Sequence, residues 1–118
     1  MASGTINIPI ANINLYNDVS QLGLSWDSIT STSNIFAAMP SYSIFICQTT
    51  NTSGSPGYPL YSEIGESGSV VIFKINSYRG IGFFTTYGSS DTGNDLKIMR
   101  TKGNNQVKWS NGIALTFS

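Results

Sequence analysis

The sequence predicts an all-β fold, namely a single antiparallel β-sandwich or barrel-like domain with one or two short helical turns. Apolar and polar residues alternate over short runs, which is the pattern of half-buried strands. Gly, Asn, Ser and Pro interrupt these runs about every 8–12 residues, at the spacing of antiparallel strands and their turns. With 118 residues, of which 40% are hydrophobic, the chain is long enough for one core and too short to expect two.

The first segment is predicted to be a strand at the margin of the domain. Isoleucine alternates with other residues from Ile6 to Ile10. Pro9 cannot donate a hydrogen bond to a neighbouring strand, so the segment suits a sheet edge or pairing with another chain. We therefore expect residues 1–14 to form a lead-in strand and residues 15–118 to form the β-sandwich domain.

Two short helical turns are expected next. Residues 17–22 begin with side chains that can cap a helix and stop at Gly23. Residues 32–39 begin with a capping hydroxyl and end at Pro40. Both segments are so short that tertiary contacts must stabilise them.

The rest of the chain is predicted to be strands and turns. Residues 43–49 are apolar on both faces near the middle, which favours a strand deep in the sheet. Residues 91–95 are expected to form a turn, and Asn111-Gly112, the strongest two-residue hairpin signal, is expected to join the last two strands. The other predicted strands are Ser69–Ile75, Ile81–Tyr87, Leu96–Thr101 and Val107–Trp109, the last two forming a hairpin.

The hydrophobic pattern also names candidate core residues. Cys47 lies in a predicted buried strand without a basic neighbour, so we interpret it as a small core residue rather than a nucleophile. The candidate core phenylalanines are Phe36, Phe45, Phe73, Phe83 or Phe84, and Phe117.

The scarcity of charge excludes several classes of function. Only 10% of the residues are charged, against about 25% in an average soluble domain, and six acids balance six bases. Such a chain has little means of neutralising a phosphate backbone, so nucleic acid is not an expected partner. No apolar run approaches the roughly 20 residues of a membrane span, and membrane insertion is not expected. The absence of His removes the usual serine and cysteine nucleophile systems and the commonest zinc ligand, and we expect no cofactor.

The carboxylates leave two interpretations open. Glu63 and Glu66, or Asp91 and Asp95, could form the pair that glycoside hydrolysis requires. Solvated loop charges, with Asp91 capping its turn, are the favoured interpretation. Oxygen atoms of Asp91, Asn94 and Asp95 could also meet a calcium ion, but their spacing does not fit the helix-loop-helix calcium pattern, and we expect no metal.

The polar surface is therefore made of hydroxyls, amides and aromatic rings. Rigid rings among short polar side chains are typical of binding surfaces, and sugars stack their C–H faces on rings while their hydroxyls pair with Asn, Asp and Ser. Any single ring here could equally lie along a strand edge with its polar end in water. The candidate glycan-binding residues are Trp26, Asn51, Tyr58, Tyr61, Tyr78, Tyr87, Asp91 and Asn94.

The C-terminal part carries a family resemblance. Residues 96–110 contain a strand with Arg100, a Gly103-Asn-Asn turn and the ending Trp109-Ser110. This order resembles the small β domains, often called knob domains, that end the tail fibres of phages and R-type bacteriocins. In that family a second Trp often follows the Trp-Ser, whereas here Asn111-Gly112 follow.

The resemblance implies a homotrimeric, non-enzymatic receptor-binding tip that attaches to host-surface polysaccharide or lipopolysaccharide. The lead-in strand, residues 1–14, would then be the end of a fibre shaft or a strand between subunits. The N-terminus lacks the basic start and apolar stretch of a secretory signal, so we expect a virion or extracellular protein released without one. The alternatives are a carbohydrate-binding module or lectin, a purely structural virion protein and, last, a small carboxylate glycosidase.

Overall fold

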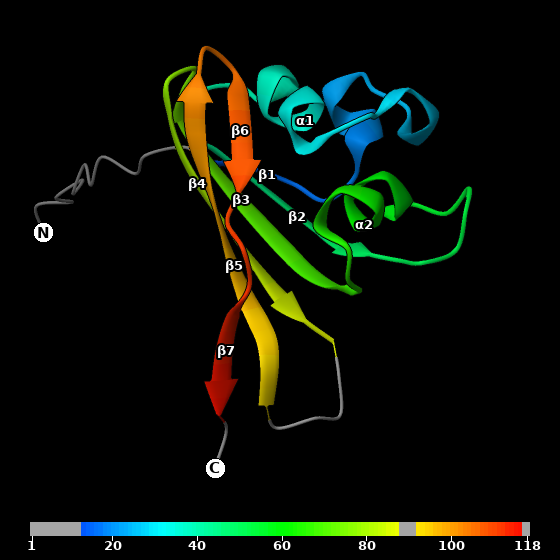
Figure 1. The fold of residues 1–118 in the computed structure, drawn as a ribbon. Coiled ribbons are helices and arrows are strands. Elements are labelled where there is room, and N and C mark those ends of the chain that lie inside the picture. The colour runs from blue at the N-terminus through cyan, green and yellow to red at the C-terminus, as the bar shows by residue number, and fades with distance from the viewer. Residues whose placement is uncertain (1–12, 88–91, 117–118) are drawn as a thin grey trace, which may run out of the picture.

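The computed structural model describes residues 13–87 and 92–116, and the side chains of all of these except residues 92–95. This part of the chain forms one mixed sheet with helices against one of its faces (Figure 1). The strand order is β1-β2-β3-β4-β5-β6, and β7 pairs with the far end of β5. The strands are β1 (Asn14–Tyr16), β2 (Ser43–Thr49), β3 (Gly68–Asn76), β4 (Arg79–Thr86), β5 (Thr92–Gly103), β6 (Gln106–Trp109) and β7 (Ile113–Thr116).

The mostly β class is confirmed, with two qualifications. The sheet is not closed into a barrel, and within the described residues the second layer consists of helices. The sheet is also not purely antiparallel, because β1 runs parallel to β2, with Leu15 beside Ile44. An all-antiparallel sheet was therefore a wrong prediction. β1 (Asn14–Tyr16) lies at the edge of the sheet, whereas residues 1–12, which make up most of the expected lead-in strand, lie outside the described part.

The helical layer has four short elements. They are the 3-10 helices η1 (Val19–Leu22) and η2 (Trp26–Ser28) and the α-helices α1 (Thr32–Ala38) and α2 (Tyr58–Ile64). The two predicted helical turns correspond to η1 and α1. Each begins with a capping box, formed by Asp18 with Gln21 and by Ser31 with Asn34, because these side chains occupy backbone groups that a short helix leaves free.

Helix α2 was not predicted as a helix. It follows a loop rich in Ser and Gly and begins after Gly57, whose positive φ of 83° only glycine adopts without strain. Pro59 suits the first turn, since its missing N–H would have no partner there. Leu60 and Ile64 face the sheet and are buried, so contacts with the core stabilise these seven residues.

Two turn predictions were wrong. Thr92 already begins β5, so the residues after Asp91 belong to a strand rather than a turn. Asn111-Gly112 does not form a two-residue hairpin between neighbouring strands, because β6 and β7 both pair with β5. Long β5 offers pairing positions for both strands, and those tertiary partners override the local turn signal. The predicted hairpin of β5 and β6 and the strand Ser43–Thr49 are confirmed.

The core lies between the helices and one face of the sheet. Phe36, Phe45 and Phe84 are fully buried there, as predicted. Phe83 points to the opposite face and is 38% exposed, and Phe73 is half-buried on that face. The structure thus decides between Phe83 and Phe84 in favour of Phe84, whereas the assignment of Phe73 to the enclosed core was wrong, because no second layer within the described residues covers that face. Phe117 lies outside the described residues.

A buried cation anchors α1 to the sheet. Lys74 of β3 is 5% exposed, and its Nζ donates hydrogen bonds to the backbone oxygen of Phe36 at 2.6 Å and to Oδ1 of Asn105 at 2.9 Å. The same nitrogen lies 4.7 Å from the centre of the Phe36 ring, within the range of a cation–π contact. Burial lowers the pKa of Lys74. The ring also fills the space left at Gly80, where an added Cβ would meet Phe36 Cε1 at 2.4 Å.

We predict that Gly80→Ala destabilises the fold by about 1–3 kcal/mol, because the new methyl group collides with the Phe36 ring and the backbone oxygen of Phe73. Urea unfolding followed by circular dichroism measures the loss. Gly103→Ala is the matched control, since its nearest contact would be Gln106 Oε1 at an ordinary 3.5 Å. Equal stability of the two variants would contradict the close packing of α1 on β4.

Candidate functional site

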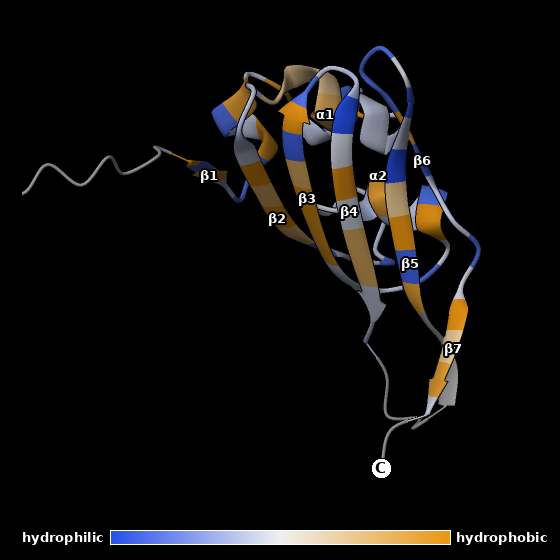
Figure 2. Cartoon of the chain, turned by 90° about the vertical axis from the view of Figure 1, so that its left-hand side faces the viewer, coloured by the Kyte–Doolittle hydropathy of each residue, from blue (hydrophilic) through white to orange (hydrophobic). Residues whose placement is uncertain are grey.

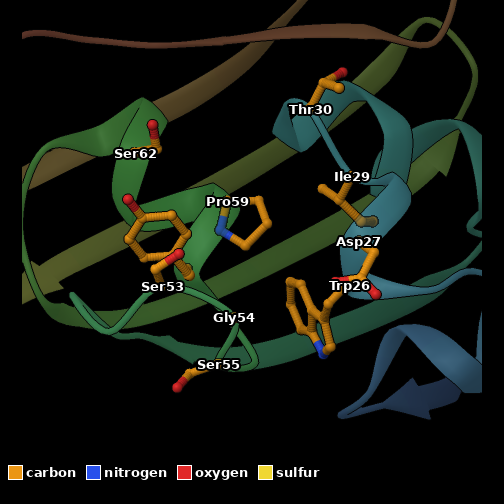
Figure 3. A pocket seen from close by; sticks show the side chains of 10 residues that line it. Trp26, Asp27, Ile29, Thr30, Ser53, Gly54, Ser55, Pro59 and Ser62 are labelled. Carbon is orange, nitrogen blue, oxygen red and sulfur yellow. The ribbon is translucent and has the colours of Figure 1, made fainter.

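An open hollow of about 500 Å³ lies on the helical side of the sheet. We call it the Trp26 cleft. One wall comes from η2 and the residues after it, and the other from the loop before α2 and from α2 itself (Figure 3). The cleft is lined by Trp26, Asp27, Ile29, Thr30, Ser53, Gly54, Ser55, Tyr58, Pro59 and Ser62.

Trp26 is held in its wall by contacts at both ends of η2. Ser25 Oγ accepts a hydrogen bond from the Asp27 N–H, which caps the short helix. The indole Nε1–H donates to Oδ1 of Asp18 at 3.1 Å. Ile29, just beyond η2, is buried in the core. The polar edge of the indole is therefore occupied inside the protein, while part of its ring lines the cleft.

Asp18 serves as both a helix cap and a support for Trp26. Its Oδ2 accepts hydrogen bonds from the hydroxyl and the backbone N–H of Ser20. These bonds, followed by the one from Trp26, lower the pKa of Asp18 below its usual value. The carboxylate is therefore ionised at neutral pH and accepts all three bonds.

The opposite wall is fixed by close backbone packing. A Cβ added to Gly57 would lie 2.0 Å from the backbone oxygen of Gln48, so the loop before α2 touches β2 directly. The rings of Tyr58 and Tyr61 stack with centroids 6.2 Å apart and an interplanar angle of 25°. Figure 3 shows Pro59 and Trp26 on opposite sides of the hollow, with Ser53 and Ser55 at its lower side. The site thus combines apolar rings with hydroxyl groups.

Glu63 connects the two helices behind the cleft. Its Oε2 accepts hydrogen bonds from the backbone N–H of Thr32 at 2.7 Å and from its Oγ1 at 3.0 Å. Thr32 Oγ1 in turn accepts a bond from Trp109 Nε1 at 2.8 Å. Oε2 of Glu66 accepts from the hydroxyl of Thr86 at 3.0 Å. Both glutamates thus bind groups of the fold, and neither lines the Trp26 cleft.

The structure brings together only part of the predicted site. Trp26 and Tyr58 line the same cleft, and Tyr61 stacks on Tyr58 beside it. Asn51 and Tyr87 line a second hollow of about 410 Å³ at the ends of β2 and β3. The remaining predicted residues are Tyr78, which is exposed in the β3–β4 connection; Asn94, which is in β5 with no side chain described; and Asp91, which lies outside the described residues.

Sequence reasoning missed several residues of the cleft. Asp27, Ile29 and Pro59 lie within three positions of a predicted aromatic residue, and that proximity was the available signal. Ser53 and Ser55 lie in residues 51–57, a stretch rich in Ser and Gly, and this composition is typical of a surface loop but does not indicate which residues the loop faces.

Further features bear on chemistry. Among the described residues, no three His, Cys, Asp or Glu side chains come together as metal ligands do, while the proposed calcium ligands Asp91, Asn94 and Asp95 fall where side chains are not described. Burial raises the pKa of the Cys47 thiol to about 12, so it stays protonated at neutral pH. No helix in the described part has both the length and the hydropathy of a membrane span.

Comparison of the chain with protein-family models, curated proteins and solved structures finds no match.

We predict that Glu63→Ala lowers the free energy of unfolding by about 1–2 kcal/mol, because two hydrogen-bond donors of Thr32 lose their acceptor. Thermal or urea unfolding measures the change. Glu63→Gln is the matched control: it keeps one carbonyl oxygen as acceptor and should lose less. Wild-type stability of Glu63→Ala would show that the carboxylate does not join α1 to α2.

Proposed function

We propose that the chain is the receptor-binding tip of a phage or bacteriocin tail fibre and that the Trp26 cleft binds a glycan of the host surface. The observation that carries the proposal is the meeting of Trp26 and Tyr58 in one open hollow, although 31 residues separate them in the sequence. The resemblance of residues 96–110 to knob domains supports the assignment to a fibre tip.

The chemistry of the cleft suits a sugar. The rings of Trp26, Tyr58 and Pro59 offer apolar surfaces to the C–H faces of pyranose rings. Asp27 can accept hydrogen bonds from sugar hydroxyls, and the hydroxyls of Ser53, Ser55 and Ser62 can both donate and accept. An open hollow, rather than an enclosed pocket, accommodates an extended polysaccharide or lipopolysaccharide chain. We propose that binding occurs without hydrolysis.

The proposal includes assembly and location. Three copies would form a homotrimeric tip on the virion or free particle, and copies together would supply the second sheet layer of the predicted β-sandwich. Several shallow sites on one particle would compensate for a weak individual site through avidity. A lectin or carbohydrate-binding module would share the cleft chemistry but act as a monomer or dimer.

A purely structural virion protein is the second candidate. The observation that favours it is the exposed apolar face of the sheet, where Ile81 is 43% exposed and Phe83 38% exposed. Aromatic and aliphatic side chains in such a position pack against neighbouring subunits without any need for a glycan.

We predict that Trp26→Ala and Tyr58→Ala each weaken glycan binding by up to about tenfold, because a stacked ring contributes about 0.5–1.5 kcal/mol beyond its buried area. A glycan array followed by titration of the best ligand, together with attachment to host cells, measures the effect. Tyr78→Ala is the matched control, since this ring is exposed but lies outside the cleft. Undiminished binding by both cleft variants would remove the cleft from the proposal.

A further inference from the structure

The face of the sheet that lies away from the helices is apolar, and no other part of residues 13–87 and 92–116 covers it. In Figure 2 this face is turned toward the viewer, and hydrophobic residues form bands across β2, β3, β4 and β5. Every second residue of these strands points to it, because side chains alternate between the faces of a sheet. We call this surface the open face, and its apolar residues include Leu15, Ile44, Ile46, Val71, Phe73, Ile81, Phe83 and Ile98.

These residues form continuous rows rather than scattered contacts. The strand register places Ile44, Phe73 and Ile81 side by side on three neighbouring strands. A second row runs through Ile46, Val71, Phe83 and Ile98 on four strands. The rings of Phe73 and Phe83 join the two rows edge to face, with centroids 6.4 Å apart and an interplanar angle of 80°.

The exposure of the open face is large for a surface that remains in water. Leu15 is 60% exposed and Ile46 37% exposed. Together with the half-buried members, the exposed apolar area is on the order of 500 Å², the size at which such patches mark interaction sites. A standard interface buries about 800 Å² on each partner, so the open face supplies much of one interface.

Among the side chains that the structure describes, charges gather at one margin of the open face. Arg100 of β5 pairs directly with Lys108 of β6 and follows Ile81 in the first row. These two cations give the edge a local positive charge, which would repel the same edge of a second copy. The margin formed by β1 and β2 carries Leu15, Ile44 and Ile46 instead.

We propose that the open face is the assembly surface of this protein and that further copies of the same chain cover it. An identical sheet offers an apolar face of matching size, and a chain with no net charge does not repel its copies. The copies pack so that their basic margins, with Arg100 and Lys108, stay apart. The number of copies, three, rests on the function proposed above, whereas the identity of the surface does not.

The test is the solution mass of the full chain, measured by size-exclusion chromatography with light scattering. We expect three times the 12.7 kDa of one chain for the wild type. Phe83→Asp and Ile46→Asp place a charge in the covered surface and should each yield a folded monomer with an unchanged circular dichroism spectrum. The double variant Ile46→Thr/Phe83→Thr introduces residues that favour strands, so it should remain folded even if the aspartate variants do not. It should also be monomeric. Tyr78→Ser, which removes an exposed ring outside the open face, is the control and should keep the wild-type mass.

Several outcomes would overturn the proposal. The first is a wild-type chain that is monomeric in solution, whether or not it binds phosphatidylcholine vesicles through this face. The second is a set of open-face variants that are folded and keep the wild-type mass. Failure of glycan binding is distinguishable, because Trp26→Ala acts on the helical side and should leave the mass unchanged. Conversely, a monomeric open-face variant should keep the affinity of a single cleft and lose multivalent attachment to cells.

Discussion

The buried ammonium group of Lys74 ties together three parts of the chain that are distant in sequence. A cation in this position needs polar partners, and it finds them in the last turn of α1 and in the connection between β5 and β6. The seven-residue helix is thereby seated on the sheet, with Phe36 over Gly80. Thr32, the first residue of α1, donates a hydrogen bond to Glu63 of α2 and so holds α2 in place. Helix α2 in turn carries one wall of the Trp26 cleft. The geometry of the cleft thus depends on a contact made at the opposite end of α1.

Much of the sheet was predictable because the residues within each strand already favour β-structure. Ser43–Thr49 combines β-branched and aromatic residues, which favour strands. Asn105, whose φ is +54°, suits the turn that joins β5 and β6 into a hairpin. Helix α2 was not predictable, because the burial of Leu60 and Ile64 rather than local preference stabilises it. The partner of β7 also depends on a distant strand, and the local Asn111-Gly112 signal pointed to the wrong neighbour.

The sequence predicted the chemical character of the candidate site, but only part of its location. Aromatic residues in Gly- and Ser-rich connections predicted exposed rings, and Tyr87 is 85% exposed. Sequence position does not determine which rings meet, however. Trp26 and Tyr58 come together because α1 and α2 are joined behind them, whereas Tyr78 lies between β3 and β4 and lines neither the Trp26 cleft nor the hollow that contains Asn51 and Tyr87. Convergence of this kind arises from tertiary contacts that have no local sequence signal.

The close contact of Gly57 with the backbone of Gln48 has a consequence for how the protein can diversify. This contact fixes the end of the loop, while residues 51–54 before it are exposed and include part of the cleft wall. Substitutions in that stretch would alter the rim of the hollow without disturbing the core or the opposite face of the sheet. If the cleft binds a host glycan and the open face joins the copies, as proposed, ligand preference and assembly could therefore change independently, with Gly57 at the boundary between the exposed loop and the packed scaffold.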